Sequence, residues 1–467
     1  MSADDMSADD KAAVAAGIRE LVDWATGCRI TDIPEPVLKR AAAVLVDDLA
    51  AMIGARDEPE VARFHAGVIE RARHAEATVL RGGHARVGRI DAAVANAVAA
   101  DWLELDEGYR RTPCHAGLYV LPASLATAEA KNLRCDELLR AIALGYEVVT
   151  RVARGWRQRA LNMQSHGRYS AIGAAAATAL LQRVDSGTMF RAVTAAATLT
   201  NPSPRSHLVA GALVRNIWPA QGAWSGMMAV EWARCGIGGS PDAFFDVYTD
   251  VLGGTPEPAA LTEALGTSWA LLDGYTKIYA CCQHLHSTVE ALLDLRPALL
   301  EAAPLEEIES VEIATHALAR PLMNPRPETT LGAKFSMPHA VAAALAIGSG
   351  GAEAFAFDTL RRPDIERLRQ RVRVKPYSPD LPPPNDRPAR ADIRLRDGRV
   401  LTAECLSARG GSDRPLPPET VTEKLEALAA PVYPAIGAVL APLQRLDPAA
   451  LGQRWRQTVD AFSSPGS

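Results

Sequence analysis

The sequence predicts a mainly helical protein with a second, α+β part, and three features of the chain support this. Nearly half of the 467 residues are hydrophobic, yet only 5% are aromatic, so alanine and leucine must supply most of the interior. An alanine-rich interior favours closely packed helices. Helical periodicity dominates the first 270 residues, whereas the alternation of apolar and polar residues that is typical of strands appears only after residue 300.

Composition also limits the function. The net charge of −5 is small and the basic residues form no stripe, which disfavours nucleic-acid binding. Seven cysteines in a long chain indicate reduced thiols. No run of about 18 apolar residues predicts a membrane span. The first residues, MSADDMSADD, lack the apolar core of a secretory signal. We therefore expect a cytoplasmic protein with no nucleic-acid or membrane partner.

The first part of the chain is expected to be a disordered lead over residues 1–10 and an all-helical domain over residues 11–270. Apolar stripes predict helices in GIRELVDWA, VLKRAAAVLVDDLAAMIGA and DELLRAIALGYEVVTRVARGW. The segment SHGRYSAIGAAAA predicts a helix with an almost continuous face of small residues, against which another backbone can pack closely.

The second part, residues 271–408, is expected to be a smaller α+β lid domain with a mainly antiparallel sheet. IESVEIAT (308–315) and RVRVKPY (371–377) alternate like half-buried strands. Residues 391–408 predict a hairpin with Asp397-Gly398 at its turn. Residues 409–462 return to helix and should pack on the first domain, and the tail SSPGS is expected to be disordered.

One stretch, DWLELDEGYRRTPCHAG (101–117), is dense in groups that can carry chemistry. It holds Glu104, Asp106, Glu107, Tyr109 and His115 on a predicted loop that follows a helix. Catalytic groups are often placed on loops that a rigid element supports. The alternative interpretation is a solvated, salt-bridged loop.

A second dense stretch, LDGYTKIYACCQHLHST (272–288), lies between the two predicted domains. Its chemically active residues are Lys277, Cys281, Cys282, His284 and His286. Their spacing lacks the C-x₂-C or H-x₃-H separations that let one zinc ion reach all of them, so a metal site is disfavoured. The other interpretation is a lysine and a histidine that face a cleft at the domain junction, a preferred place for ligands.

Fingerprints for nucleophilic hydrolysis and for nucleotide binding are missing from the sequence. The remaining histidines, cations and carboxylates suit proton transfer beside an anionic substrate. The cations expected to bind carboxylates are Arg110, Arg111, Arg215, Lys277 and Lys334.

Several spaced motifs, in the same order, resemble the MmgE/PrpD family of 2-methylcitrate dehydratase, cis-aconitate decarboxylase and iminodisuccinate epimerase. They are ELDEGYRRTPCHAG, SHGRYSAIGAAAA, ALVRNIWPAQGAWSGMMA, KIYACCQHLH and GAKFSMPHAVAAAL. The resemblance implies a site without a cofactor or metal in the cleft between a helical domain and a lid, and a homodimer. It also implies a small di- or tricarboxylate substrate, from or to which a proton moves beside a carboxylate.

The resemblance also implies roles for individual residues. The catalytic set is His115, His166, Lys277 and one of Glu104 and Asp106, and the substrate-binding set is Tyr109, Arg215, Cys282, His286, Lys334 and Ser336. His115 is expected to be the acid, and the base is either His166 or one of the two carboxylates. Arg215 replaces a lysine of most relatives, and Cys282 replaces a histidine that is important in the decarboxylase. These departures argue against decarboxylation of cis-aconitate.

Three functions therefore stay open at the level of the sequence. The first is a hydro-lyase of the 2-methylcitrate dehydratase type. The second is an epimerase or racemase of a dicarboxylic amino or imino acid, which needs the same residues on two faces of one carbon. The third is a non-catalytic binding protein that has kept the fold.

Overall fold

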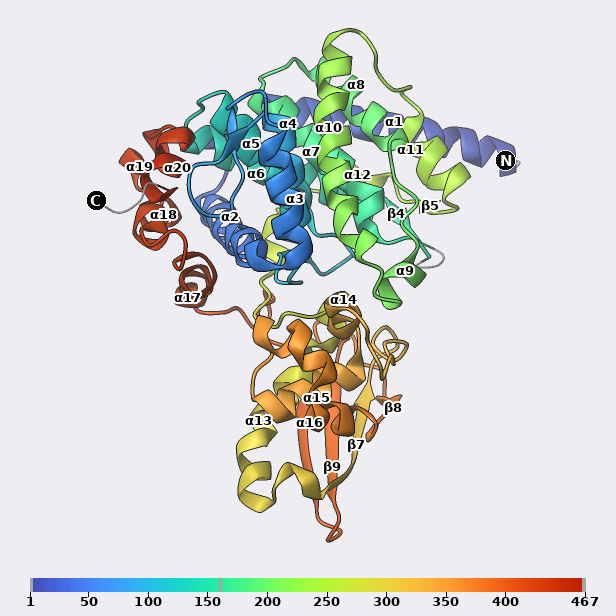
Figure 1. Ribbon diagram of the computed structural model, residues 1–467. Coiled ribbons are helices and arrows are strands. Elements are labelled where there is room, and N and C mark those ends of the chain that lie inside the picture. Colours follow the sequence, from blue (N-terminus) through green and yellow to red (C-terminus); the bar gives the residue numbers. More distant parts are fainter. Residues whose placement is uncertain (1–2, 159–161, 464–467) are drawn as a thin grey trace.

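The computed structural model describes residues 3–158 and 162–463, and it consists of a large helical part and a smaller part that contains a sheet (Figure 1). Residues 1–2 of the expected disordered lead and residues 464–467 of the SSPGS tail lie outside the described residues. Residues 3–10, also expected to be disordered, instead belong to helix α1 (Ala3–Gly27). Alanine favours helix, and an ion pair of 2.6 Å between Lys11 and Asp246 ties α1 to the helical part.

The helical part is formed by two stretches of the chain, one from the N-terminal half and one from the C-terminus. Its helices are α1, α2 (Glu35–Gly54), α3 (Pro59–Glu70), α4 (Arg89–Ala100), α5 (Ala116–Ala130), α6 (Cys135–Arg154), α7 (Ser165–Leu181), α8 (Ser186–Thr198), α9 (Arg205–Val209), α10 (Trp218–Arg234), α11 (Ala243–Phe245), α12 (Ala259–Thr262), α17 (Pro418–Ala429), α18 (Ile436–Gln444), α19 (Pro448–Gly452) and α20 (Trp455–Ser463). Helix α17 packs on α2, and its Val421 and Leu425 join the core of the helical part.

Helix α7 lies at the centre of the helical part, and all of its residues are buried. It packs against α5, α6, α8 and α10. The contact with α10 depends on glycine, because a Cβ at Gly222 would overlap Ser170 and a Cβ at Gly226 would overlap the backbone oxygen of Ala171. The small-residue face therefore brings two helices close together, as the sequence predicted.

The smaller part is a four-stranded sheet covered on one face by helices. Its elements are α13 (His286–Ala302), β7 (Ile308–Thr315), α14 (Thr330–Lys334), α15 (Met337–Ile347), α16 (Pro363–Arg369), β8 (Val372–Pro376), β9 (Ala389–Leu395) and β10 (Val400–Cys405). The strand order is β10-β9-β7-β8; β9 pairs antiparallel with β10 and β7, whereas β7 and β8 are parallel. The mainly helical fold with a small, mainly antiparallel sheet is confirmed, and the parallel edge pair makes the sheet mixed.

Three short ladders of two residues each connect loops of the helical part. They are β1 (Ala77–Thr78) with β2 (Arg86–Val87), β3 (Gly108–Tyr109) with β6 (Gly274–Tyr275), and β4 (Trp156–Arg157) with β5 (Thr255–Pro256). The β3–β6 ladder joins the acidic stretch to the segment that leads to Lys277. It requires glycine, because a Cβ at Gly108 would overlap the ring of Tyr275.

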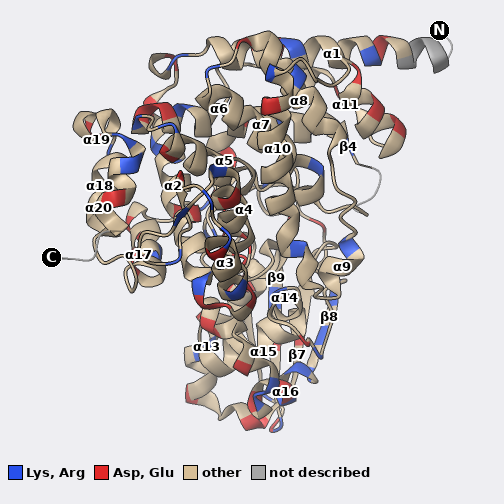
Figure 2. Cartoon of the chain, turned by 45° about the horizontal axis from the view of Figure 1, so that its top comes forward, with Lys and Arg blue, Asp and Glu red and all other residues tan. Residues whose placement is uncertain are grey.

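Charges of both signs are interspersed over both parts of the molecule (Figure 2). Every helix in the described ranges is too short or too polar to cross a membrane.

Candidate active site

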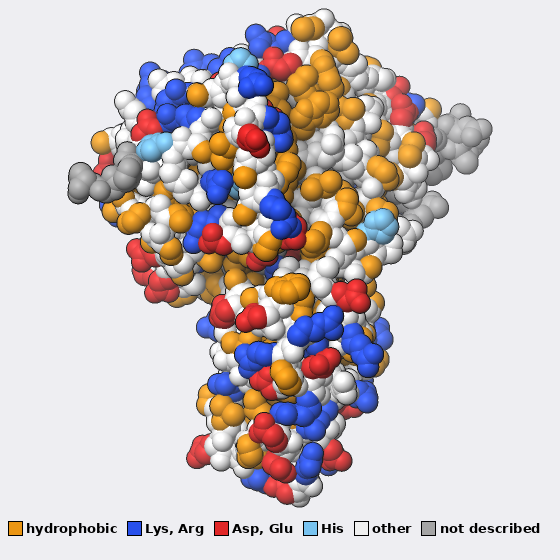
Figure 3. All heavy atoms as spheres, in the orientation of Figure 1, with side chains coloured by type: hydrophobic (Ala, Val, Ile, Leu, Met, Phe, Trp, Pro, Cys, Tyr) orange, Lys and Arg blue, Asp and Glu red, His pale blue; other side chains and the backbone are white. Residues whose placement is uncertain are grey.

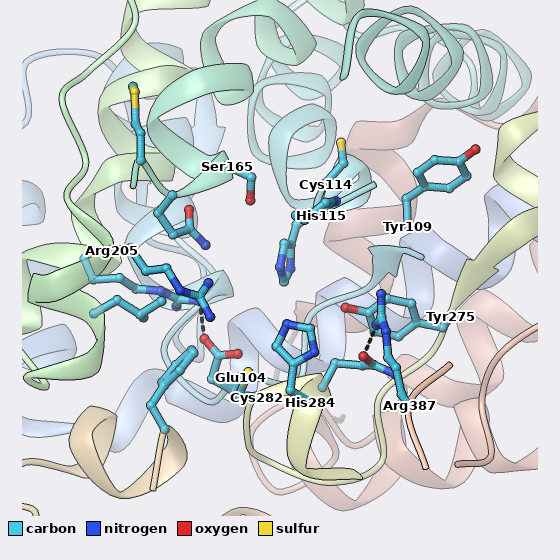
Figure 4. Close-up of a pocket in the computed structure, with 17 residues that line it drawn as sticks. Glu104, Tyr109, Cys114, His115, Ser165, Arg205, Tyr275, Cys282, His284 and Arg387 are labelled. Carbon is cyan, nitrogen blue, oxygen red and sulfur yellow. Dashed lines mark hydrogen bonds and ion pairs between the residues drawn. The ribbon is translucent and has the colours of Figure 1, made fainter. Parts of the chain in front are cut away.

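A small cavity of about 80 Å³ lies between the helical part and the sheet-containing part (Figure 4). The helical part contributes Glu104 and His115 from the acidic stretch and Arg205 from α9. The other part contributes His284 and Arg387 from loops before α13 and β9. Because one water occupies at least about 10–15 Å³ by this kind of measure, the cavity has room for several waters or a small acid.

His115 and Asp106 form a hydrogen-bonded dyad at the cavity wall. The His115 Nδ1 lies 2.6 Å from Asp106 Oδ2, and His115 is the residue that immediately precedes α5. Since Nδ1 faces the carboxylate, Nε2 is the ring nitrogen left to face a ligand. A carboxylate in this position fixes the orientation of the ring, as a positioned general acid requires.

Behind the dyad, cations and carboxylates alternate in a buried chain. The Lys277 ammonium lies 3.0 Å from Asp106 and 3.4 Å from Glu104, and Arg215 pairs with Glu104 and with Asp101. All of these side chains are at most 2% exposed. A buried charge needs a partner, and here each has at least one.

The buried chain sets the charges of its members. Burial raises the pKa of Asp106, but Lys277 and His115 outweigh it and hold that pKa well below its ordinary value. Burial lowers the pKa of Lys277, whereas Asp106 and Glu104 raise it well above the ordinary value. Asp106 is therefore ionised and Lys277 is protonated at neutral pH, so Lys277 stabilises the dyad as a fixed positive charge.

His166 is fully buried in the second residue of α7 and does not line the cavity. Its Nδ1 lies 2.9 Å from the Tyr119 hydroxyl and its Nε2 lies 3.0 Å from Asp101. Burial lowers the pKa of His166 well below its ordinary value, with Arg215 adding to the effect, so the ring is neutral.

The rings of His166 and His115 meet edge to face, with centroids 4.8 Å apart. The chain of charges begins at His115, which contacts Asp106, and ends at His166, which contacts Asp101. The contact between the two rings therefore joins its two ends. The structure thus brings together His115, His166, Arg215 and Lys277 as the sequence predicted. Of these four, His115 and Arg215 line the cavity, and His166 supports His115.

Glu104 lines the cavity in an unusual backbone conformation, with a φ of 55°. Residues other than glycine rarely adopt this left-handed region, and such strain is found most often at functional sites. In this conformation the carboxylate pairs with both Arg215 and Lys277. Figure 4 shows Glu104 at the wall of the cavity.

The remaining predicted residues fall into two groups. Cys282 and Tyr109 line the cavity, although the Tyr109 ring points away from its centre in Figure 4. His286, Lys334 and Ser336 do not line it. His286 contacts the backbone oxygen of Cys281, Lys334 donates to the backbone oxygen of Trp102, and Ser336 caps α15. In this structure these three side chains hold backbone segments near the site.

Arg205 and Arg387 are cavity residues that the sequence did not point to. They lie on opposite sides of the cavity in Figure 4. The Arg205 guanidinium has no hydrogen bond or ion pair with a described residue, and Arg387 donates to Gln283 and to the backbone oxygen of Arg110. Arg387 Nε also lies 3.6 Å from Asp386, a longer contact than the ion pairs of Arg215. Because Arg205 has no carboxylate partner among the described residues, the cavity keeps an excess of positive charge.

Asp101 was also missed as a site residue, although it begins the acidic stretch. It follows the last residue of α4, where a carboxylate lacks a favourable helix dipole. This position was the one feature of the sequence that could have identified Asp101 as a site residue. Burial raises the pKa of Asp101 well above its ordinary value, and Arg215 opposes the shift.

The cysteine- and histidine-rich stretch forms no metal centre among the described residues, where no three His, Cys, Asp or Glu side chains are placed to hold one ion. A short 3₁₀ turn over Gln283–Leu285 separates Cys282 from His286, and His286 turns to a backbone oxygen.

Comparison with known proteins is consistent with this architecture. The MmgE/PrpD N-terminal domain matches residues 19–252 and the MmgE/PrpD C-terminal domain matches residues 279–438. The chain therefore belongs to the MmgE/PrpD family, whose members are enzymes that act on carboxylic acids.

Two curated relatives extend the match over most of the chain. A cis-aconitate decarboxylase of Aspergillus terreus is 25% identical over 442 residues, which cover 88% of this chain and 89% of that protein. The cis-aconitate decarboxylase-like protein oryM of Aspergillus oryzae (strain ATCC 42149 / RIB 40) is 24% identical over 441 residues, 88% of this chain and 90% of that protein.

Proposed function

We propose that the protein is a lyase that removes water from a small hydroxylated di- or tricarboxylate. The observation that carries the proposal is the His115–Asp106 dyad, which opens into a cavity that Arg205 and Arg387 make electropositive. A carboxylate between the arginines would form charge-assisted hydrogen bonds, the strongest kind a protein offers. The proposal needs no cofactor.

In the proposed reaction the arginines bind the substrate carboxylates and orient the carbon chain toward His115. Removal of a proton beside a carboxylate places negative charge on that carboxylate, and the neighbouring guanidinium groups stabilise it. His115 then gives its proton to the leaving hydroxyl group, which departs as water. Asp106, Lys277 and Glu104 keep His115 oriented throughout and do not exchange protons with the substrate.

Two other reactions use the same groups. Epimerisation of a dicarboxylic amino or imino acid would return the proton to the opposite face of the same carbon. Decarboxylation is favoured by the names of the two relatives, whereas Arg215 argues against it because a guanidinium does not donate a proton near neutral pH. A non-catalytic role fits less well, because a binding protein has no use for a dyad at its cavity wall.

A panel of hydroxylated and unsaturated di- and tricarboxylic acids in D₂O separates these reactions. We expect one acid to give an unsaturated product, seen by ultraviolet absorbance, with loss of activity in His115→Gln. Deuterium in recovered substrate without an alkene would instead identify an epimerase, and release of carbon dioxide a decarboxylase. No reaction with any acid would contradict the proposal.

We propose that the protein acts as a homodimer, as family resemblance implies. Val214, Ile217 and Trp224 are exposed apolar residues on one face of α10 and the turn before it. Apolar side chains gather over α10 in Figure 3. An exposed patch of apolar side chains is typical of a protein–protein interface.

A further inference from the structure

His284 is a second imidazole in the cavity, and the His115–Asp106 dyad does not use it. It lies in the 3₁₀ turn over Gln283–Leu285, and in Figure 4 its ring faces the cavity across from His115. Neither ring nitrogen has a hydrogen-bond partner among the described residues, and Nδ1 is fully buried. Buried polar atoms are almost always paired, so an unpaired imidazole in a cavity needs an explanation.

Other interior histidines of the chain are explained by structure alone. In each case Nε2 lies at hydrogen-bond distance from a backbone oxygen: His65 with Ala95, His286 with Cys281, His316 with His284, and His339 with Ala354. Such contacts hold neighbouring segments together. The His284 ring makes no such contact with a backbone oxygen. Instead, the backbone oxygen of His284 lies at hydrogen-bond distance from His316 Nε2. The turn is thus fixed, and the His284 ring packs against the His316 ring at 5.4 Å between centroids while its nitrogens stay available to a ligand.

The charge state of His284 suits it to accept a proton. Burial lowers its pKa well below the ordinary value, and Arg387, His316 and Arg205 add to the effect. The ring is therefore neutral at neutral pH. A bound dicarboxylate would offset the charges of Arg205 and Arg387, and the proton affinity of His284 would rise when substrate arrives. His115 differs, because its Nδ1 lies 2.6 Å from the Asp106 carboxylate.

Glu104 is the other group at the cavity wall that could accept a proton. Its carboxylate is already paired with Arg215 and Lys277, so its oxygens face these two cations and are less available to a substrate C–H group. His166 and Asp106, the further bases that the sequence suggested, do not line the cavity.

We propose that His284 is the general base of the proposed reaction and that His115 is the acid on the other side of the cavity. This inference rests on the proposed function. The His284 imidazole takes the proton from the carbon beside a substrate carboxylate, and the electron pair of that C–H bond moves into the carboxylate. The pair then forms the carbon–carbon double bond as the C–O bond breaks, and the His115 proton completes the leaving water.

The test separates proton abstraction from loss of water, with the acid that the wild-type protein turns over. For His284→Gln we expect both deuterium exchange into substrate and product formation to fall by about 10²–10⁴-fold, the usual contribution of a general base. The KM should stay within about threefold, because substrate binding depends on the arginines. His115→Gln should lose product formation but keep exchange. His207→Gln, which changes an exposed histidine of α9, is the matched control and should behave as wild type.

Failure of this inference differs from failure of the proposed function. If wild type turns over no acid, the proposed function is wrong. If wild type is active and His284→Gln keeps exchange within about fivefold, His284 is not the base. Loss of exchange in Glu104→Gln alone would assign the base to Glu104. Should His284→Gln fold poorly, His284→Ala with added imidazole replaces it. Restored exchange supports the proposal, and a folded variant without restoration overturns it.

Discussion

At the scale of residues, the site is a chain of charges that ends at two imidazoles. Asp106, Lys277 and Glu104 stand behind His115 and are too deeply buried and too fully paired to react themselves. Their contribution is to fix one ring in one orientation, and a preorganised site of this kind avoids reorganisation cost during the reaction. The reactive groups are those that face the cavity.

Substitution of the dyad should therefore affect kcat in a graded way. We expect His115→Gln to lower kcat by about 10²–10⁴-fold, since the acid is removed. Asp106→Asn should lower it less, because the acid remains but its orientation and charge stabilisation are weakened. Steady-state kinetics measures both, and His74→Gln on the surface is the control. Equal activity of His115→Gln and wild type would refute the assigned role.

Arg205, whose guanidinium has no carboxylate partner among the described residues, should govern substrate binding. We expect Arg205→Gln to raise KM by about 10–100-fold, because a hydrogen bond to a charged group contributes about 1.5–3 kcal/mol. The kcat should change less. Arg63→Gln, a largely exposed arginine of α3, is the matched control. A KM unchanged by Arg205→Gln would show that the substrate does not reach α9.

The residues of the site were predicted unevenly, and the reason is physical. His115, Lys277 and Arg215 stand in dense or distinctive local patterns, so the sequence could point to them. Arg205 begins the short helix α9 and Arg387 stands in a loop, and only the packing of two parts of the chain makes them neighbours of His115 in the cavity wall. A local sequence pattern does not predict such contacts between distant segments of the chain.

At the scale of elements, local patterns were enough for most helices and for one hairpin. The Asp397-Gly398 turn joins β9 and β10 as predicted, with Gly398 at a φ of 87°. The alternation in β7 and β8 predicted strands but not their partners, because a period of two does not specify which neighbour a strand takes. Their parallel pairing therefore came only from the structure.

The contact between α7 and α10 should be intolerant of any added side chain. We expect Gly226→Ala to cost about 1–3 kcal/mol of unfolding free energy, since the new Cβ meets backbone atoms of α7 that cannot move away. Gly27→Ala, where nothing lies within 4 Å, is the control and should leave stability close to wild type. Urea unfolding measures the difference. Similar midpoints for the two variants would mean that α7 and α10 are less tightly packed.

At the scale of the whole molecule, the fold depends on pH through a buried carboxyl group. Burial raises the pKa of Glu107 to about 7 in the folded protein, from an ordinary value near 4.5. Between these values the folded state holds a proton that the unfolded state has lost, so stability should fall as pH rises from about 4.5 to 7 and stay low above it. The shift corresponds to about 3 kcal/mol.

Glu107→Gln should flatten this dependence, because an amide does not titrate. We expect the melting temperature of wild type to fall more between pH 5.5 and 8 than that of the variant. If the melting temperatures of wild type and variant fall equally between pH 5.5 and 8, Glu107 is not the cause of the pH dependence of stability. The comparison is between pH slopes, since the amide can accept from only one of the Tyr146 hydroxyl and the Gly117 N–H, and this loss shifts both ends of the range for the variant.

The exposed apolar face along α10 should carry the homodimer. We expect a double variant, Ile217→Lys with Trp224→Lys, to halve the mass measured by light scattering, because charge disfavours burial of that face. Val251→Lys, at an exposed apolar position elsewhere, is the control. A dimer that survives the double variant would place the interface on another surface.

The most direct test of the central claim is a crystal structure of His115→Gln with the acid that the wild-type protein consumes. We expect one carboxylate of the acid at Arg205 and another at Arg387. The reacting carbon should lie about 3–3.5 Å from the His284 ring, a distance suited to proton transfer. An acid bound outside the cavity, or inside it without contact to either arginine, would contradict the account.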